Sequence, residues 1–449
     1  MSTSTTTAVS AARNDTALKR GFTTPTLVIF GLAYMVPMTV FTTYGIVNEI
    51  THGHLSASYA VTLAAMMFTA ASYAVMSRQN PAAGSAYTYA RSGFGGGVGF
   101  LTGWAIMIDY ILLPMLNYLL IGLYLSTRFP SVPAWVFSMG ALVVVTLLNI
   151  VGVTAVKGAN AVLVALQVIF FLVFFVFAMR SFDPAASPLQ PFFSPDFEIS
   201  SIVAGAAILC LSFLGFDAIS TLSEETREPR RTVPRAIVLT TLAGGALFIA
   251  ISWAAAMAYP EVITGDGADT AATVMLNSIG GRLLTSLFLA AYVVGALGSA
   301  LASQASVARI LFAMGRDKVL PRGIFGWVSA RFGTPVGAVL VVAAISISAV
   351  FAQVDSVASL VSFGALTAFS LVNLSVISVF WFRKQGDARP NPVLHGVVPV
   401  IGFGLTVWLW TSLSPQSIAI GVGWTALGGV WLLIITRGFR KPVPKLSRE

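Results

Sequence analysis

Long apolar blocks alternate with short polar stretches along the whole chain, and no amphipathic stripe divides a block into a polar and an apolar face. A helix of roughly 20 apolar residues is long enough to cross the hydrocarbon core of a bilayer. Roughly twelve blocks reach that length, which leaves no room for a soluble domain. They lie near residues 26–47, 57–76, 97–125, 132–152, 158–179, 200–222, 234–258, 283–305, 335–353, 357–382, 397–413 and 418–436. The pattern predicts an all-α membrane protein with roughly twelve transmembrane helices.

The composition supports this class, because 56% of the residues are hydrophobic and only 10% are charged, whereas soluble domains carry about 25% charged residues. The single cysteine, Cys210, lies inside an apolar block and is interpreted as a small core residue. His52, His54 and His395 are too few and too scattered for a metal site, so neither a metal nor a cofactor is predicted. The stretch 93–97, Gly-Phe-Gly-Gly-Gly, lacks the Lys-Ser/Thr of a phosphate loop and is expected to be a flexible inner loop. No enzyme motif is present.

Basic residues are divided unequally between the predicted loops. If the N-terminus is cytoplasmic, all of the 26 Lys and Arg residues except Arg128, Arg180 and Arg282 fall on the inner side. This bias predicts that both termini lie inside, because Lys and Arg concentrate in cytoplasmic loops. It also accounts for the net charge of +9 without a nucleic-acid partner, since these charges meet an anionic inner leaflet. Residues 1–20 have no apolar run and are predicted to be a disordered cytoplasmic tail rather than a signal peptide, and residues 437–449 a second tail.

Two blocks contain helix-breaking residues near their middle. The first contains Pro37, which has no backbone N–H, and the sixth contains Gly215 followed by Asp217. Pro37 alone is also compatible with a simple kink. Breaks in the first and sixth helices, however, are typical of five helices repeated in inverted topology, with a substrate site where the two repeats meet. We therefore predict one transmembrane domain, composed of a first repeat, a second repeat and two extra helices. The boundaries are about 21–436 for the domain, 25–180 and 198–382 for the repeats, and 397–436 for the extra helices.

Two acidic residues lie at the predicted depth of the bilayer centre. Asp109 is in the middle of the third block and Asp217 follows the break in the sixth. An acid at a helix centre costs about 2.5–3.5 kcal/mol, so each should face a cavity or a partner. No Lys or Arg lies in the centre of any block, so a cationic substrate or a proton is the expected counter-charge. Two other roles stay open: Asp217 as the N-cap of the second half-helix, and Asp109 as a structural partner of Tyr110 or of another neighbouring hydroxyl.

A stretch of mixed charge follows the sixth block and contains Glu224 and Glu225. It is expected at the inner mouth of the pathway, where exchangeable ion pairs suit a gate. The same composition fits a solvated loop equally well. Glu224 and Glu225 are therefore candidate gating residues.

Several motifs resemble those of the amino acid–polyamine–organocation (APC) superfamily of transporters. They are Phe-Leu-Gly-Phe-Asp at 213–217 with Glu-Glu-Thr at 224–226, Asn-Pro-Ala-Ala-Gly-Ser-Ala-Tyr at 80–87, and Ala-Arg-Ile-Leu-Phe-Ala-Met-Gly-Arg-Asp at 308–317. Within the superfamily, Gly-Leu-Ala-Tyr at 31–34, Pro-Met-Thr-Val-Phe at 37–41 and Asp109-Tyr110 are most similar to bacterial putrescine importers. The resemblance implies a proton-driven importer of a diamine in the bacterial cytoplasmic (inner) membrane, with twelve helices and a five-plus-five repeat.

The break in the first block bears on the choice between an amine and an amino acid. Amino-acid carriers of the superfamily usually have a Gly-Ser-Gly-like turn there, whose free N–H groups hold the substrate carboxylate. This chain has Pro37-Met38-Thr39, with no glycine and one N–H fewer, so a substrate without a carboxylate fits better. Thr42 stands where the putrescine importers have an acid, which weakens the preference for a dication or shifts the substrate to another amine. Gln167 stands where some relatives have a lysine in place of a sodium ion, which leaves the coupling ion open.

Together these features predict a secondary active transporter that imports putrescine or a related diamine, coupled to protons. Asp109 and Asp217 are expected to face the ammonium groups, or one of them, with Asp217 the candidate, carries the coupled proton. Met38 and Thr39 are expected beside the substrate at the first break. Aromatic side chains are expected along its aliphatic stem, with cation–π contributions of about 0.5–2 kcal/mol each; they are Tyr34, Tyr110, Phe213 and Phe216. The alternatives are an amino-acid importer or exchanger of the same superfamily and, from another class, a membrane receptor or channel.

Overall fold

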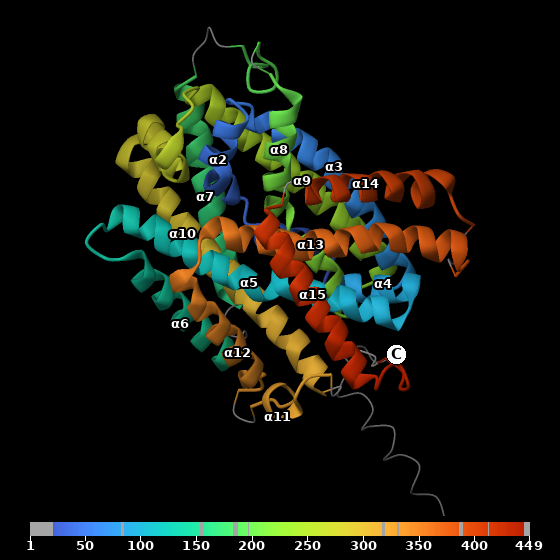
Figure 1. Ribbon diagram of the computed structural model, residues 1–449. Coiled ribbons are helices and arrows are strands. Elements are labelled where there is room, and N and C mark those ends of the chain that lie inside the picture. Colours follow the sequence, from blue (N-terminus) through green and yellow to red (C-terminus); the bar gives the residue numbers. More distant parts are fainter. Residues whose placement is uncertain are drawn as a thin grey trace, which may run out of the picture.

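The computed structural model describes residues 21–81, 85–152, 157–182, 187–195, 197–316, 319–329, 332–385, 389–411 and 413–443. Over these ranges the chain consists of helices joined by short turns, without a β-strand, which confirms the predicted all-α class (Figure 1). The predicted N-terminal tail and residues 444–449 of the predicted C-terminal tail lie outside the described residues.

The α-helices are α1 Thr24–Met35, α2 Thr39–Ile50, α3 Leu55–Gln79, α4 Ser85–Phe94, α5 Gly96–Arg128, α6 Ala134–Val151, α7 Lys157–Arg180, α8 Ile199–Leu209, α9 Pro229–Ala258, α10 Ala271–Arg316, α11 Arg322–Phe325, α12 Val336–Ser346, α13 Val354–Ile377, α14 Val398–Trp410 and α15 Pro415–Ile435. Short 3₁₀ or π segments accompany them: η3 Cys210–Phe213, η4 Ala218–Glu225, η5 Gly265–Thr270, η6 Ile347–Phe351, η7 Ser378–Phe382 and η8 Val393–Val397. Among the described residues, 9 helical segments are long and apolar enough to cross a membrane, and the bent pair α1–α2 makes up to 10. Two shorter apolar helices, Ala165–Arg180 and Val336–Phe351, fill the remaining predicted blocks.

Two predicted segments differ from the structure. The stretch 93–97, expected to be a flexible loop, is a tight junction in which α4 ends at Phe94 and α5 begins at Gly96. Gly95 makes the turn alone with a φ of 96°, which glycine reaches without steric cost. Before the eighth block, residues 271–280 form a short helix that was not predicted, and a backbone break at Gly281 separates it from the predicted span. Both differences arise because short helices near a membrane surface need no long apolar run.

The first predicted break is confirmed. α1 ends at Met35, α2 begins at Thr39, and the two are bent by 50° relative to each other. Val36 has a φ of 45°, and Pro37 has no N–H with which to continue α1. Hydrogen bonding resumes at once, because the Thr39 N–H donates to the Val36 carbonyl over 2.8 Å. The three residues between the helices are buried.

The second predicted break is present in the span formed by α8, η3 and η4. Gly215 separates the two 3₁₀ segments with a φ of 130°, a conformation that side chains with a Cβ rarely adopt. A Cβ added to Gly215 would lie 2.8 Å from Cδ1 of Tyr34 and 3.1 Å from the backbone nitrogen of Met35. The second break therefore packs directly against the C-terminal end of α1, so the two breaks meet.

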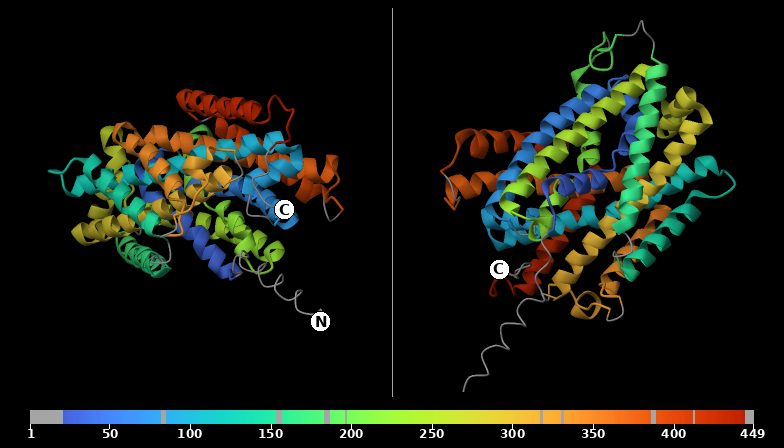
Figure 2. Two further views of the ribbon diagram at one scale, coloured as in Figure 1. Left: turned by 90° about the horizontal axis from the view of Figure 1, so that it is seen from below. Right: turned by 180° about the vertical axis from the view of Figure 1, so that it is seen from behind.

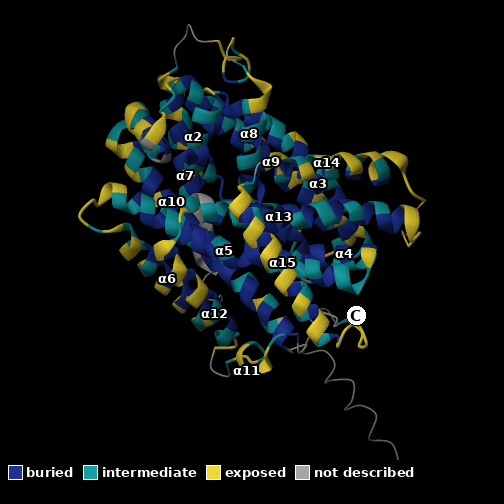
Figure 3. Cartoon of the chain, in the orientation of Figure 1, coloured by how far each residue is buried: buried dark blue, intermediate teal, exposed yellow. Residues whose placement is uncertain are grey.

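The broken helices lie in the middle of the bundle. Figure 2 (right) shows α1 and α2 between the pair α3 and α9 on one side and the pair α7 and α10 on the other. In the most apolar window of α5, 72% of the residues are buried, against 33% in α6 and 17% in α15. The exposed apolar side chains of α6, α14 and α15 form the outer surface (Figure 3), as expected for helices in contact with lipid. Asp109 thus lies on a core helix.

Two tryptophans join α15 to α5. The indole Nε1 of Trp104 donates to the Trp424 carbonyl over 3.0 Å, and Nε1 of Trp424 donates to the Trp104 carbonyl over 2.8 Å. The two rings stack with centroids 5.2 Å apart. Gly428 comes so close that an added Cβ would lie 2.4 Å from Cδ1 of Trp104. These contacts fix the position of α15 along α5, although little of α15 is buried.

Contacts between the turns agree with the two sides predicted from the basic residues. On the predicted inner side, the Arg227 N–H donates to the Phe22 carbonyl over 3.0 Å and so joins the start of α1 to the end of η4. On the predicted outer side, the Gly265 N–H donates to Oε1 of Glu49 over 3.0 Å and joins η5 to α2. Each contact links segments assigned to the same side.

Candidate substrate site

Asp217 lies at the second break, and its carboxylate is held by two hydrogen bonds. The Tyr110 hydroxyl donates to Oδ2 over 3.3 Å, and the Gly215 N–H donates to Oδ1 over 3.2 Å. Asp217 occupies the N-cap position of η4 but makes no capping hydrogen bond to that segment. The structure does not favour the N-cap alternative, because the carboxylate accepts from the backbone N–H two residues before it. Through these two hydrogen bonds, Asp217 instead links the second break to α5, which carries Tyr110.

Asp109 lies in the middle of α5 and has a different environment. Its side chain is 3% exposed, and within the described part of the chain its buried Oδ1 has no hydrogen-bond partner. Tyr110, one of the structural partners considered for Asp109, donates to Asp217 instead. α13 packs closely beside it, since a Cβ added to Gly364 would lie 3.0 Å from Cβ of Asp109. A buried carboxylate oxygen without a partner is costly unless a cation or a proton joins it.

Tyr34, at the end of α1, lies near both acids. Its hydroxyl is buried and has no hydrogen-bond partner among the described residues. The Tyr34 ring packs against Gly215 at the second break, and Tyr110, which follows Asp109 in α5, donates to Asp217. Two buried carboxylates near each other repel unless a positive charge or a proton is added. Every described Lys and Arg lies outside the buried core, so that charge must come from elsewhere.

The other predicted site residues are only partly brought together. Met38 is fully buried, and the buried hydroxyl of Thr39 has no partner in the described ranges. Phe216 stacks on Phe369 of α13, with centroids 5.2 Å apart. Phe213 packs edge-on against Phe248 of α9 at 5.2 Å, and no contact joins it to either acid. The side chains of Glu224 and Glu225 lie outside the described residues, so their gating role stays a prediction.

Tyr73 of α3 was not predicted from the sequence. Its ring packs edge-on against Phe216, Phe369 and Tyr89, with centroids 5.6, 5.8 and 5.9 Å away. The hydroxyls of Tyr73 and Tyr89 are buried without a partner in the described structure. These four rings join α3, α4 and α13 to Phe216, the residue before Asp217. The sequence does show a tyrosine near the inner end of an apolar block. Aromatic residues at that place are also common as plain core residues, so the tyrosine alone did not indicate a site.

Comparison with known proteins identifies the family. A family profile described as amino acid permease matches residues 21–436. The chain belongs to this family. The permease is 38% identical over 436 residues to the low-affinity putrescine importer PlaP of Escherichia coli strain K12. The aligned region covers 95% of this chain and 96% of that protein.

More distant relatives of the permease are named for other substrates. It is 26% identical over 452 residues to the methylthioribose transporter of Bacillus subtilis strain 168, with 96% of each chain covered. It is 27% identical over 457 residues to the branched-chain amino acid permease BcaP of the same organism, covering 95% of this chain and 93% of the relative. These relatives are transporters, so the resemblance to the APC superfamily and the expectation of a transporter rather than an enzyme are confirmed.

Proposed function

We propose that this permease is a secondary active transporter that imports a diamine such as putrescine across the bacterial cytoplasmic membrane. The observation that carries the proposal is the buried, unpartnered Oδ1 of Asp109, close to a second carboxylate and away from every described basic side chain. An ammonium group provides both the positive charge and the hydrogen-bond donors that the Asp109 carboxylate lacks. The 38% identity to the putrescine importer PlaP supports the same class of substrate.

The two acids have different roles in this proposal. Asp109 binds an ammonium group, because its Oδ1 is free to accept. Asp217 keeps the second break in shape through Gly215 and Tyr110, and it is the candidate carrier of a coupled proton. The unpartnered hydroxyl oxygen of Tyr34 accepts from the ammonium N–H groups. The rings of Phe216 and Tyr110 face the aliphatic chain of the diamine.

Backbone hydrogen bonding at the first break favours an amine over an amino acid. The N–H groups of Thr39, Val40 and Phe41 already donate to the carbonyls of the residues three positions earlier, over 2.8, 3.4 and 3.0 Å. Pro37 has no N–H to offer. A substrate carboxylate would therefore find few free donors where amino-acid carriers of the superfamily bind it. A diamine has no carboxylate and needs none of these donors.

Uptake into proteoliposomes tests this function. With the outside more acidic than the inside, labelled putrescine should accumulate against its gradient and exchange on counterflow. Unlabelled putrescine should compete better than ornithine, which adds only a carboxyl group. Stronger competition by ornithine or arginine would place the permease among amino-acid carriers. A channel gives no uphill accumulation, a receptor gives no uptake, and an exchanger requires internal substrate.

The proposed orientation, with both termini in the cytoplasm, has a separate test. Thr264 precedes η5 on the predicted outer side, and Ser329 follows α11 on the predicted inner side. In a Cys210→Ala background, Thr264→Cys should react with an impermeant thiol reagent on intact cells, whereas Ser329→Cys should react only after the cells are opened. Labelling of Ser329→Cys on intact cells would reverse the orientation.

A further inference from the structure

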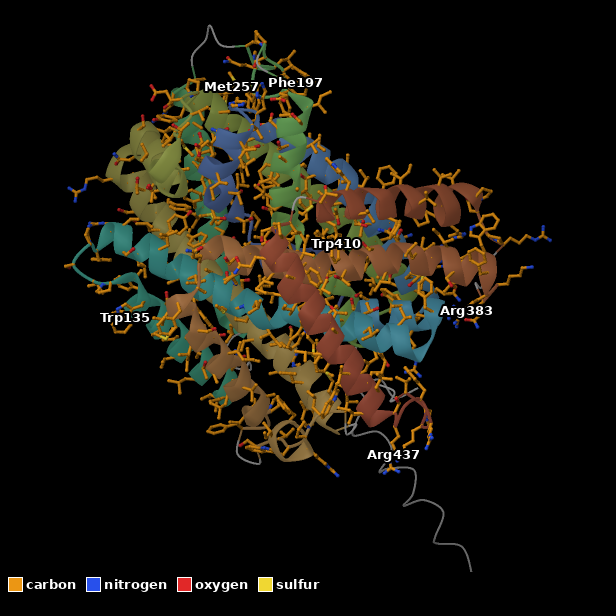
Figure 4. The ribbon with its side chains drawn as sticks, in the orientation of Figure 1. Trp135, Phe197, Met257, Arg383, Trp410 and Arg437 are labelled. Atoms are coloured by element: carbon orange, nitrogen blue, oxygen red, sulfur yellow. The ribbon has the colours of Figure 1, made fainter. Side chains whose placement is uncertain are left out.

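Basic side chains gather at one corner of the predicted inner side, away from the two buried acids. They belong to the ends of α13 and α15 and to the segments that follow them, and all are exposed. We call this set the basic corner: Arg383, Lys384, Arg389, Arg437, Arg440 and Lys441. Figure 4 shows Arg383 at the right and Arg437 below it, both far from Phe197 and Met257 at the top.

The junction between α4 and α5 brings the two parts of the basic corner together. Nη2 of Arg383 lies 3.7 Å from the position of a Cβ added to Gly95. Cβ of Val443 lies 3.0 Å from the position of a Cβ added to Gly96. The guanidinium of Arg383 and the segment that carries Arg440 and Lys441 therefore cover neighbouring glycines, although they are far apart in sequence.

The segment after α15 is folded back in a defined way. Arg437, Gly438 and Phe439 all have positive φ values, of 50°, 64° and 61°, a conformation that is costly for arginine and phenylalanine. The Lys441 N–H donates to the Thr436 carbonyl over 2.9 Å, and this bond closes the turn. Trp431 anchors the end of α15, because its Nε1 donates to the Val319 carbonyl over 2.8 Å. The basic side chains are thus presented from a built turn and not from a loose tail.

From residue 371 to 443 the sequence has one acid, Asp387, which lies outside the described residues, so the six basic side chains leave a net positive charge at this corner. Three exposed aromatic side chains lie next to the basic ones in sequence: Trp381, Phe382 and Phe439 are 41%, 79% and 62% exposed. Aromatic rings next to Lys and Arg are typical of the membrane–water interface. The neighbouring helices α14 and α15 expose apolar side chains suited to acyl chains.

From this arrangement we propose that the basic corner binds the phosphate headgroup of an anionic phospholipid of the inner leaflet. Guanidinium groups bind phosphate oxygens in a bidentate way, and Lys441 adds a point charge. The flanking rings lie at the depth of the headgroups, and the acyl chains run along α14 and α15. A soluble phosphate would use the same charges but would gain nothing from the aromatic and apolar surface.

Melting temperatures of the purified full-length permease in detergent micelles test this proposal. The probes are dioleoylphosphatidylglycerol, dioleoylphosphatidylcholine and inorganic phosphate, each titrated separately. Phosphatidylglycerol should raise the melting temperature at concentrations where the other two do not. In the variant Arg383→Gln/Lys441→Gln, the apparent affinity for phosphatidylglycerol should fall by roughly 25-fold, at about fivefold per charge removed near an anionic lipid.

Arg282→Gln serves as the matched control, because Arg282 is an exposed arginine on the predicted outer side. It should keep the full response to phosphatidylglycerol. If the double variant melts lower without lipid, Arg440→Gln alone gives a second measurement, with a fall of about fivefold. Equal responses to phosphatidylglycerol and phosphatidylcholine would overturn the proposal. So would an equal response to inorganic phosphate, or an unchanged response in the double variant.

Discussion

Asp109 and Asp217 are both buried acids at the centre of the bundle, but they differ in the hydrogen bonds that the chain provides to their carboxylates. Asp217 lies at a helix break and accepts hydrogen bonds from Gly215 and Tyr110. Asp109 lies in an unbroken helix, where the backbone N–H groups are already used, and its Oδ1 has no partner among the described residues. A break supplies free backbone donors and so can satisfy an acid within the chain. An intact helix cannot, and its acid must be satisfied from outside.

The largest effect is expected at Asp109. Asp109→Asn removes the free carboxylate, so diamine affinity should fall about 10–150-fold, which corresponds to about 1.5–3 kcal/mol for a lost charge-assisted hydrogen bond. Binding of labelled putrescine to the purified protein measures the change. Glu261→Gln is the control, because it neutralises an exposed acid outside the bundle and should leave affinity unchanged. Normal affinity in Asp109→Asn would remove this residue from the site.

An intermediate effect, on stability and coupling, is expected at Asp217. Asp217→Ala loses both hydrogen bonds and should lower the free energy of unfolding by about 1–3 kcal/mol, measured as a lower melting temperature. Asp217→Asn can still accept from Gly215 and should melt close to the native protein. If Asp217 carries the proton, this amide variant keeps binding and counterflow but loses accumulation driven by a pH gradient. Full accumulation in Asp217→Asn would assign the proton elsewhere.

The smallest effect is expected at Tyr110. Tyr110→Phe removes the hydrogen bond to Oδ2 of Asp217 and should cost about 0.5–1.5 kcal/mol of stability. Tyr118→Phe is a matched control on the same helix, because the Tyr118 hydroxyl is buried without a partner in the described structure. It should be neutral or slightly stabilising. Equal losses in the two variants would mean that the bond to Asp217 contributes nothing.

The positions of the breaks and of the two acids could be predicted from the sequence, because each depends on local chemistry. Pro37 has no N–H with which to continue a helix, Gly215 permits a backbone that other residues avoid, and an acid in an apolar block is costly without a partner. The partners of these groups could not be predicted. Whether Tyr110 turns toward Asp109 or Asp217 depends on how α5 is rotated against the second break, and sequence spacing does not encode that rotation. Tyr73 was missed for the same reason, since its role depends on rings from α4 and α13.

The paired tryptophans have a mechanical consequence. Sliding α15 along α5 by one helical turn, about 5.4 Å, would break both indole bonds at once, in hydrocarbon that offers no replacement donors or acceptors. The two indole bonds therefore resist sliding of α15 along α5, the helix that carries Asp109. α15, a peripheral helix with few buried residues, thus holds α5 in position and gives it a lipid-facing neighbour.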